Sequence, residues 1–246
     1  MRKVNILGAD IDDVTMEEAV EEIGRWIREK TPAQVNTLNA EILFGAYSDP
    51  KLLSTINRCA MVTPDGSGIL WAARRLGRPL RERVTGIDLL QRILKEAPQK
   101  KWSLYFYGSR PEVLEQAVAN MKRDYPGLSI SGYTHGYIPQ EAQNDLLRDI
   151  REKSPDLLFV ALGAPRQEYW ISEHLPELPP LVAIGVGGSL DVISGTLKRA
   201  PSLFQKLHLE WLYRTLIQPS RIGRTLVLPR FMALVSRTAR EEKKKK

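Results

Sequence analysis

The feature that most constrains this chain is a regular alternation of short apolar runs and amphipathic segments between residues 102 and 188. The apolar runs predict strands at WSLYFYG, LSISGY, DLLFVALG and LVAIGVGG. The segments between them carry apolar residues at helical spacing and predict helices at PEVLEQAVANMKRDYP, QEAQNDLLRDIREKSP and PRQEYWISEHL. Strands that alternate with helices of this length predict an α/β fold, Rossmann-like, with a largely parallel sheet flanked by helices.

The N-terminal part of the chain follows the same plan. VNILGADI predicts one strand, and Thr15 with Glu18 three residues later is a capping box that predicts the start of a helix. AQVNTL and MVTP predict two further strands, and Pro50 is expected to divide the helical pattern between them in two. Helices are also expected over SGILWAARRLG and GIDLLQRILKEA. With 246 residues and 43% hydrophobic side chains, the chain can bury one substantial core.

Composition excludes several classes of protein. The single cysteine, Cys59, excludes an intramolecular disulfide, and the three scattered histidines lack the spacing of a structural zinc site. The opening MRKVNILGADIDD reaches acidic residues before it builds the apolar core of a signal peptide. There is also no uninterrupted apolar run of roughly 18 residues that would span a bilayer. We therefore expect a cytoplasmic protein.

The net charge of +7 is concentrated near the C-terminus. Residues 198–246 carry 13 basic and 3 acidic side chains, a net of +10, whereas residues 1–197 carry 23 basic and 26 acidic side chains, a net of −3. This asymmetry predicts a catalytic domain at residues 1–195 and a basic, amphipathic helical appendage at residues 196–246, with a local electrostatic role.

Three interpretations fit the apolar residues of this appendage, which recur at helical spacing among the arginines. Such a helix can lie on an anionic membrane surface, it can pack into the core with a solvated basic face, or it can bind nucleic acid. Periodicity does not separate the first two. The apolar residues are mostly aliphatic, which favours lipid over nucleic acid, so we expect no nucleic-acid partner.

Polar residues and glycines follow the predicted strands, where ligands bind in sheets of this type. Glycines allow the backbone to approach a phosphate or a flat base, and helix N-termini offer unpaired N–H groups to an anion. These positions predict a nucleotide or phosphorylated ligand. They are Thr37, Asn39, Asp65 to Gly68, Gly108, Ser109, Arg166, Gln167 and Gly187 to Asp191.

Each of these signals also has a structural interpretation. GVGGSL follows a strand, but Leu190 replaces the third glycine of a dinucleotide-binding motif, which disfavours a nicotinamide-dependent oxidoreductase. No P-loop motif occurs, which disfavours a P-loop NTPase. Asp65 in TPDGSG is either a general base or the N-cap of the next helix. Thr37 and Asn39 can serve only to satisfy loop backbone. Tyr137 is either a packing aromatic or a base-stacking one.

Five ordered motifs resemble one family. They are TLNAEILFGAYSDP, TPDGSGILWAARRLG, ALGAPRQEYW, GVGGSLDVISGTLKRAP and LEWLYRTLIQPSRIGR. Together they resemble the WecG/TagA/CpsF family of bacterial glycosyltransferases, over nearly the whole chain. The resemblance is greatest to the TagA-like branch, which implies transfer of N-acetylmannosamine from its UDP-sugar to a prenyl-diphosphate-linked N-acetylglucosamine in wall teichoic acid synthesis, at the inner face of the cell membrane. A different donor, such as UDP-N-acetylmannosaminuronic acid, and a non-catalytic nucleotide-binding module at the membrane are the alternatives.

The resemblance also implies roles for individual residues. Inverting transfer needs a base near the acceptor hydroxyl, and Asp65 matches the base proposed for the family. The departing diphosphate needs positive charge, and the appendage arginines match that role without a metal cofactor. These arginines are Arg214, Arg221 and Arg224. The substrate-binding residues implied by the resemblance and by loop position are Thr37, Asn39, Gln167, Gly136, Tyr137 and Asp191.

Two further expectations concern metal and movement. Asp10 and Asp12 form an Asp-x-Asp pair, which holds a divalent ion in many sugar transferases, but they do not match the family's motifs and are interpreted as a turn. The appendage is expected to be mobile in solution and to dock over the pocket at the membrane. Its leucines are expected to be partly exposed and to promote homo-oligomers. These are Leu203, Leu209, Leu212 and Leu216.

Overall fold

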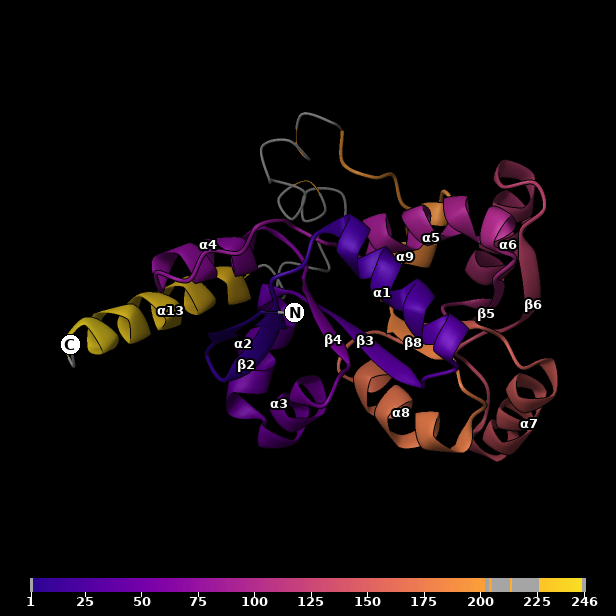
Figure 1. Cartoon of the computed structure of the whole chain (residues 1–246), viewed down its shortest axis with the longest axis horizontal. Helices are drawn as coiled ribbons and strands as arrows, with labels where there is room; N and C mark the ends of the chain where they lie inside the picture. Colours follow the sequence, from indigo (N-terminus) through magenta and orange to yellow (C-terminus); the bar gives the residue numbers. More distant parts are fainter. Residues whose placement is uncertain (1, 202–203, 205–212, 214–225, 245–246) are drawn as a thin grey trace.

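The described residues form a six-stranded sheet and a separate two-stranded hairpin. The computed structural model describes residues 2–201, 204, 213 and 226–244 (Figure 1). The sheet has the order β4-β3-β8-β7-β5-β6, and every strand pair in it is parallel, which confirms the predicted α/β class. Its strands are β3 (Ala33–Leu38), β4 (Met61–Pro64), β5 (Ser103–Gly108), β6 (Ser129–Thr134), β7 (Leu157–Ala161) and β8 (Val182–Gly185).

The first strand differs from the prediction. Instead of one strand over residues 4–11, the chain forms an antiparallel hairpin of β1 (Lys3–Ile6) and β2 (Ala9–Asp12). Leu7 and Gly8 both have positive φ, 52° and 92°, and two successive residues of this kind form the tight turn that suits the twist of a hairpin. The side chain of Asn5 accepts a hydrogen bond from the Gly8 N–H at 3.2 Å and closes the turn.

The Asp-x-Asp pair was wrongly predicted to be a turn. Asp10 and Asp12 lie in β2, and Asp12 is buried. The Asp12 carboxylate accepts a hydrogen bond from the Val62 N–H of β4 at 2.8 Å. Because β4 is an edge strand, this contact pairs a backbone N–H that the sheet itself leaves open. Burial raises the pKa of Asp12, against the lowering effect of that hydrogen bond and of Lys3.

Helices cover both faces of the sheet (Figure 1). One face packs against α1 (Met16–Glu29), α5 (Gly86–Lys100), α6 (Pro111–Asp124) and α9 (Ser189–Ile193). The other packs against α7 (Gln143–Lys153) and α8 (Arg166–His174), each of which is flanked by one short 3₁₀ turn, η1 (Gln140–Ala142) and η2 (Leu175–Glu177). The capping box at the start of α1 is confirmed, with Thr15 and Glu18 exchanging hydrogen bonds of 3.2 and 3.0 Å.

A third apolar cluster joins the beginning of the chain to its last helix. It contains residues of the hairpin and of α2 (Ala40–Ser48), α3 (Pro50–Asn57), α4 (Ser67–Arg75) and α13 (Val227–Lys244). Pro50 begins α3, which confirms the predicted division of the helical pattern. Phe231 and Val235 of α13 are fully buried against α2 and α4, and Glu242 pairs with Arg78 at 2.8 Å. For α13, the core-packing alternative is therefore the one observed, and the division at residue 195 stays a prediction.

No helix within residues 2–201 or 226–244 combines the length and the hydropathy needed to cross a bilayer. The predicted site arginines and the four leucines expected to promote self-association lie outside the described residues. These are Arg214, Arg221 and Arg224, and Leu203, Leu209, Leu212 and Leu216.

Candidate active site

Asp65 lies where β4 ends, at the carboxyl edge of the sheet. Its N–H donates to the carbonyl of Leu38 at 2.8 Å, and its side chain is half-buried. The following helix, α4, begins at Ser67 and has Gly66 as its N-cap, with no side-chain cap. The N-cap interpretation of Asp65 is therefore wrong. Asp65 precedes the N-cap position, and its carboxylate accepts instead from the Gly86 N–H of α5 at 3.1 Å.

This contact places the Asp65 carboxylate at the beginning of a long helix. Thr85 is the N-cap of α5 and accepts from the Asp88 N–H at 3.2 Å, while Gly86 is the first helical residue. The first N–H groups of a helix have no partner within it, and the helix dipole favours negative charge there. The N-terminus of α5 thus holds and orients the Asp65 side chain.

Thr37 lies beside the same helix start. It is buried in β3, and its hydroxyl donates to the Gly185 carbonyl of β8 at 3.0 Å. A Cβ atom on Gly86 would lie 3.0 Å from the Thr37 hydroxyl oxygen, so Thr37 and Asp65 share Gly86 as a neighbour. Thr37 thus has a backbone contact, but with the end of strand β8 and not with a loop as expected, and a contact with substrate stays a prediction.

Asn39 is the N-cap of α2. Its side-chain oxygen accepts from the Ile42 N–H at 3.0 Å, and the residue is half-buried. Asn39 thus has a structural contact, but with the first turn of α2 and not with loop backbone as expected. A role for Asn39 in binding substrate stays a prediction.

Gln167 and Asp191 lie on either side of the glycine turn after β8. Gln167, 3% exposed at the start of α8, accepts from the Gly187 N–H at 3.1 Å. A Cβ atom on Gly185 would lie 2.7 Å from the Gln167 amide nitrogen, so the side chain lies directly against this strand end. The carboxylate of Asp191 would lie 3.3 Å from a Cβ atom on Gly188. A continuous path of contacts therefore runs from Asp65 through Thr37 to Gln167 and Asp191.

Gly136 and Tyr137 lie after β6, where three loops meet. The Gly136 N–H donates to the Ser109 carbonyl at 2.9 Å, and a Cβ atom on Gly136 would lie 2.9 Å from the Leu162 side chain. The loops after β5, β6 and β7 are thus in contact at this residue. Tyr137 is 70% exposed, so its interpretation as a packing aromatic is wrong. An exposed ring here is available to stack on a flat ligand.

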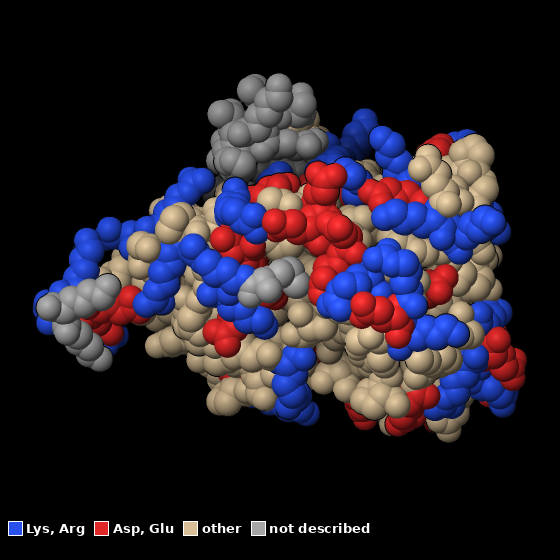
Figure 2. Space-filling model, viewed as in Figure 1, with Lys and Arg blue, Asp and Glu red and all other residues tan. Residues whose placement is uncertain are grey.

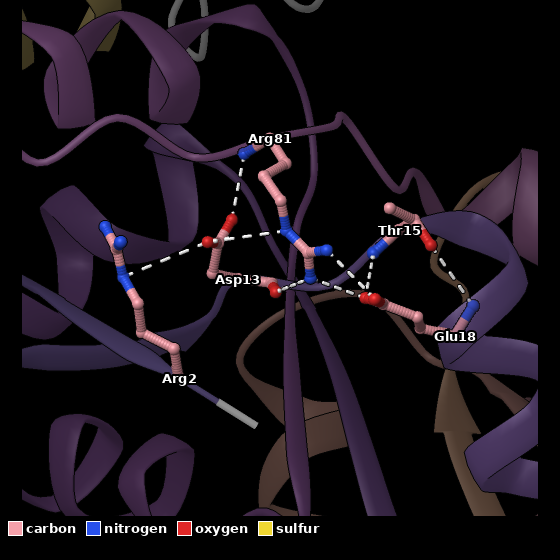
Figure 3. A network of polar contacts seen from close by, with 5 residues as sticks. All are labelled: Arg2, Asp13, Thr15, Glu18 and Arg81. Carbon is pink, nitrogen blue, oxygen red and sulfur yellow. Dashed lines mark hydrogen bonds and ion pairs between the residues drawn. The ribbon is translucent and has the colours of Figure 1, made fainter.

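The loop from α4 to α5 is tied down by Arg81 (Figure 3). The Arg81 N–H donates to the Asp13 carboxylate at 2.9 Å, and its guanidinium donates to Glu18 at 2.9 Å and also to the Asp13 carbonyl. Farther along this loop, the Val84 N–H donates to the Pro64 carbonyl at 3.0 Å. These contacts fix the loop that brings Gly86 to Asp65.

An open groove of about 450 Å³ lies over this network. Figure 2 shows acidic and basic side chains intermixed on this face of the molecule. Ligand pockets are mostly apolar, whereas every residue lining this groove is charged. None of the predicted site residues lines it. The lining residues are Arg2, Asp13, Glu18, Glu21, Glu22, Arg25, Arg28 and Arg81.

Two contacts at this edge were not anticipated from the sequence. Arg199, shortly after α9, pairs with Asp88 of α5 at 2.5 Å, which attaches the chain beyond α9 to the helix that contacts Asp65. Glu168, next to Gln167, is buried against two polar side chains of β3, Gln34 and Asn36. The alternation of polar and apolar residues in AQVNTL was an available signal, because a polar row on a central strand must face polar partners.

Comparison with known proteins identifies the family. The sequence profile described as "Glycosyl transferase WecG/TagA/CpsF family" matches residues 4–245. The chain belongs to the WecG/TagA/CpsF family. This confirms the resemblance carried by the five motifs and makes the chain a member of a glycosyltransferase family.

Similar members of the WecG/TagA/CpsF family have been named for their activity. A Bacillus spizizenii protein is 38% identical over 219 residues, which cover 89% of this chain and 84% of that protein. A Staphylococcus aureus protein is 38% identical over 246 residues, which cover 99% of this chain and 96% of that protein. Both are named N-acetylglucosaminyldiphosphoundecaprenol N-acetyl-beta-D-mannosaminyltransferase.

Proposed function

We propose that this chain is an inverting glycosyltransferase that moves N-acetylmannosamine from UDP-N-acetylmannosamine to prenyl-diphosphate-linked N-acetylglucosamine. The product is the lipid-linked disaccharide of wall teichoic acid synthesis. The names of the two relatives support the transferred sugar and the lipid-linked acceptor. The observation that carries the proposal is the Asp65 carboxylate, half-buried at the carboxyl edge of the sheet and held by the Gly86 N–H at 3.1 Å.

The proposed chemical step is a single displacement. The acceptor hydroxyl oxygen attacks the anomeric carbon of N-acetylmannosamine from the face opposite UDP. The bond from that carbon to the diphosphate oxygen breaks as the new glycosidic bond forms, and the hydroxyl proton passes to Asp65. UDP leaves with the bonding electron pair, and the configuration at the anomeric carbon is inverted.

The remaining residues are proposed to bind the two substrates. Thr37, Asn39 and Gln167 hold sugar hydroxyls and the acceptor, while Gly136, Tyr137 and Asp191 form the nucleotide side of the pocket. The exposure of the Tyr137 ring supports a stacking role. We propose that Arg214, Arg221 and Arg224 balance the charge of the departing diphosphate without a metal cofactor, since a guanidinium binds phosphate oxygens in pairs.

We also propose that the protein works on the inner face of the membrane. A lipid-linked acceptor requires a catalyst that reaches the bilayer surface. Near α13 the structure has three large exposed side chains, Leu226, Met232 and Tyr47, together with arginines of that helix. Apolar side chains among cations suit an anionic membrane surface. Binding of the protein to vesicles with and without phosphatidylglycerol, at low and high salt, tests this part of the proposal.

The decisive experiment measures UDP release in EDTA. Wild type and Asp65→Asn are given UDP-N-acetylmannosamine and a short-chain prenyl-diphosphate N-acetylglucosamine acceptor. We expect turnover by the wild type and a loss of about 100-fold or more in the variant, as for the removal of a general base. Equal turnover by the two proteins contradicts the role of Asp65. If the wild type turns over only with UDP-N-acetylmannosaminuronic acid, the proposed donor is wrong.

A further inference from the structure

A buried carboxyl group lies between α8 and β3. Glu168 is 1% exposed. Its Oε1 atom accepts from the side-chain amides of Gln167 at 2.9 Å and Asn36 at 3.3 Å. Its backbone carbonyl accepts from the Gln34 amide at 3.1 Å. Glu168 is thus surrounded by neutral amides, two of them on the neighbouring strand.

The charged groups around Glu168 do not neutralise it. Among the residues that the structure describes, Glu168 takes part in no ion pair. On α3, Lys51 lies over the Tyr169 ring at 5.0 Å, and Arg58 donates to side chains of its own helix. Burial raises the pKa of the nearby Cys59 thiol to about 12.

The Tyr169 phenol is another titratable group near Glu168. Burial, its hydrogen bond to Asp49 and the charge of Asp49 raise its pKa to about 12. Both the thiol and the phenol are therefore neutral near pH 7. A buried carboxylate among such neighbours has an energetic cost that no cation offsets.

Each of the two side chains in the contact between Asn36 and Glu168 has a buried acceptor atom without a partner. Oε2 of Glu168 and Oδ1 of Asn36 both lie inside the protein without a hydrogen-bond partner. Buried polar atoms are nearly always paired, and two acceptors cannot pair with one another. A single proton on Oε2 changes this, because a protonated carboxyl is a donor at one oxygen and an acceptor at the other.

We propose that the Glu168 side chain is a neutral acid. Its Oε2 atom donates to Asn36 Oδ1, while Asn36 Nδ2 donates back to Oε1. This reciprocal pair positions Gln167 and the Gly187 turn for binding of the UDP-sugar. Both unpaired atoms then gain a partner. Burial also raises the pKa of Glu168, against the lowering effect of its hydrogen bonds from Gln167 and Asn36. Glu168 is a positioning residue, since its contacts are with protein groups.

The pair reaches the candidate active site through Gln167. The Gln167 amide donates to Glu168 with its nitrogen and accepts from the Gly187 N–H with its oxygen, so both of its polar atoms are fixed. Gly187 has a φ of 49° and belongs to the turn that leads into α9, where Asp191 lies. The position of this turn therefore depends on the orientation of Gln167, which the Glu168 carboxyl sets. The role in donor binding rests on the proposed function, whereas the protonation of Glu168 does not.

Infrared spectroscopy tests the protonation without any substrate. At pH 7, a difference spectrum between wild type and Glu168→Gln should contain the C=O stretching band of a protonated carboxyl. Glu173→Gln is the matched control, because Glu173 lies on the same helix and is exposed. Its difference spectrum should contain carboxylate bands alone. A Glu168→Gln difference spectrum that also contains only carboxylate bands overturns the proposal.

The pH dependence of stability is the second measurement. The raised pKa of Glu168 means that the folded state keeps a proton that the unfolded state releases. The stabilisation is complete below the ordinary pKa of glutamic acid and is lost as the pH rises through the folded-state pKa. Glu168→Gln lacks this titration. Its melting temperature should therefore rise relative to that of wild type as the pH increases from the ordinary pKa of glutamic acid through the folded-state pKa of Glu168. A constant difference between the two proteins across the window contradicts the proposal.

Kinetics separates positioning from a purely structural role. Glu168→Gln imitates the neutral acid, since its amide can still donate to Asn36 Oδ1 and its oxygen can still accept, so it should keep kcat and the donor KM within about twofold. Glu168→Asp is too short to keep the pair and should raise the donor KM severalfold with a smaller change in kcat. An equal loss in both variants contradicts positioning by the neutral pair. If the wild type has no transferase activity, the proposed function fails while the infrared result still stands.

Discussion

Two carboxyl groups of the molecule, those of Asp65 and Glu168, have opposite surroundings. Asp65 is half-exposed and accepts from the first N–H of a long helix, where the helix dipole favours a negative charge. Glu168 is buried among side-chain amides and has an oxygen that lacks a donor. The same functional group is therefore suited to accepting a proton in one place and to keeping one in the other. In our proposal, the surroundings of each carboxyl group and not its residue type decide its role.

Exchanging each carboxyl for its amide gives the largest expected contrast. Asp65→Asn should lower transferase turnover by about 100-fold or more, because an amide cannot accept the acceptor's proton. Glu168→Gln should leave turnover near that of wild type, because an amide reproduces the neutral acid. Both variants are assayed for UDP release at saturating substrates. A similar loss of turnover in the two variants would contradict the proposed difference between the two carboxyl groups.

The second prediction concerns the pair formed by Asn36 and Glu168. A double-mutant cycle with Asn36→Ala and Glu168→Ala should give a coupling of about 0.5–3 kcal/mol in the free energy of unfolding, as for side chains in one hydrogen-bond network. The matched control cycle combines Asn36→Ala with Glu173→Ala, where the coupling should be near zero. Urea titrations at pH 7 measure both. Additive effects in the first cycle would show that the two side chains do not act together.

A smaller effect on turnover is expected from Gly86→Ala, at the N-terminus of α5 where the Asp65 carboxylate binds. In Gly86→Ala the new Cβ would lie 3.0 Å from the Thr37 hydroxyl oxygen. We expect a shift of the Gly86 N–H away from Asp65 and a several-fold fall in kcat with the donor KM nearly unchanged. Gly45→Ala is the control, because a Cβ on this α2 residue has nothing within 4 Å. Unchanged kinetics in Gly86→Ala would mean that the contact with Asp65 does not matter for turnover.

The smallest expected effect is at Arg81, on the surface side of the same loop. Arg81→Gln removes the ion pairs with Glu18 and Asp13. The pair with Glu18 is exposed and screened by salt, and the buried Asp13 carboxylate keeps its hydrogen bond from the backbone N–H of residue 81, so the melting temperature should fall by a few degrees at most at low ionic strength. The difference from wild type should shrink at high salt. A large loss that is insensitive to salt would instead indicate that the loop depends on Arg81 for its fold.

The sequence predicted the features that depend on local pattern. The alternation after residue 102, the capping box at Thr15 and the break at Pro50 all report short-range preferences, and the structure has each of them. The hairpin was missed because the apolar run continues through Leu7, whose positive φ is unusual for a leucine.

The candidate site was only partly predictable for a related reason. Position after a strand was enough to select Asp65, but its contact with Gly86 joins residues that are 21 positions apart. The contact between Asn36 and Glu168 spans 132 positions. Spacing within a motif does not encode such pairings, which arise only when the sheet order brings the strands and their helices together.

The packing of α13 affects how the protein folds while it is being synthesised. Phe231 and Val235 complete an apolar cluster whose other members belong to the hairpin, to α2, α3 and α4, and to neighbouring strands near the beginning of the chain (Figure 1). During translation, those early helices leave the ribosome long before α13 does. Their apolar faces therefore remain uncovered while the rest of the sheet is synthesised, and a nascent chain of this protein offers a binding surface to chaperones until its last helix emerges.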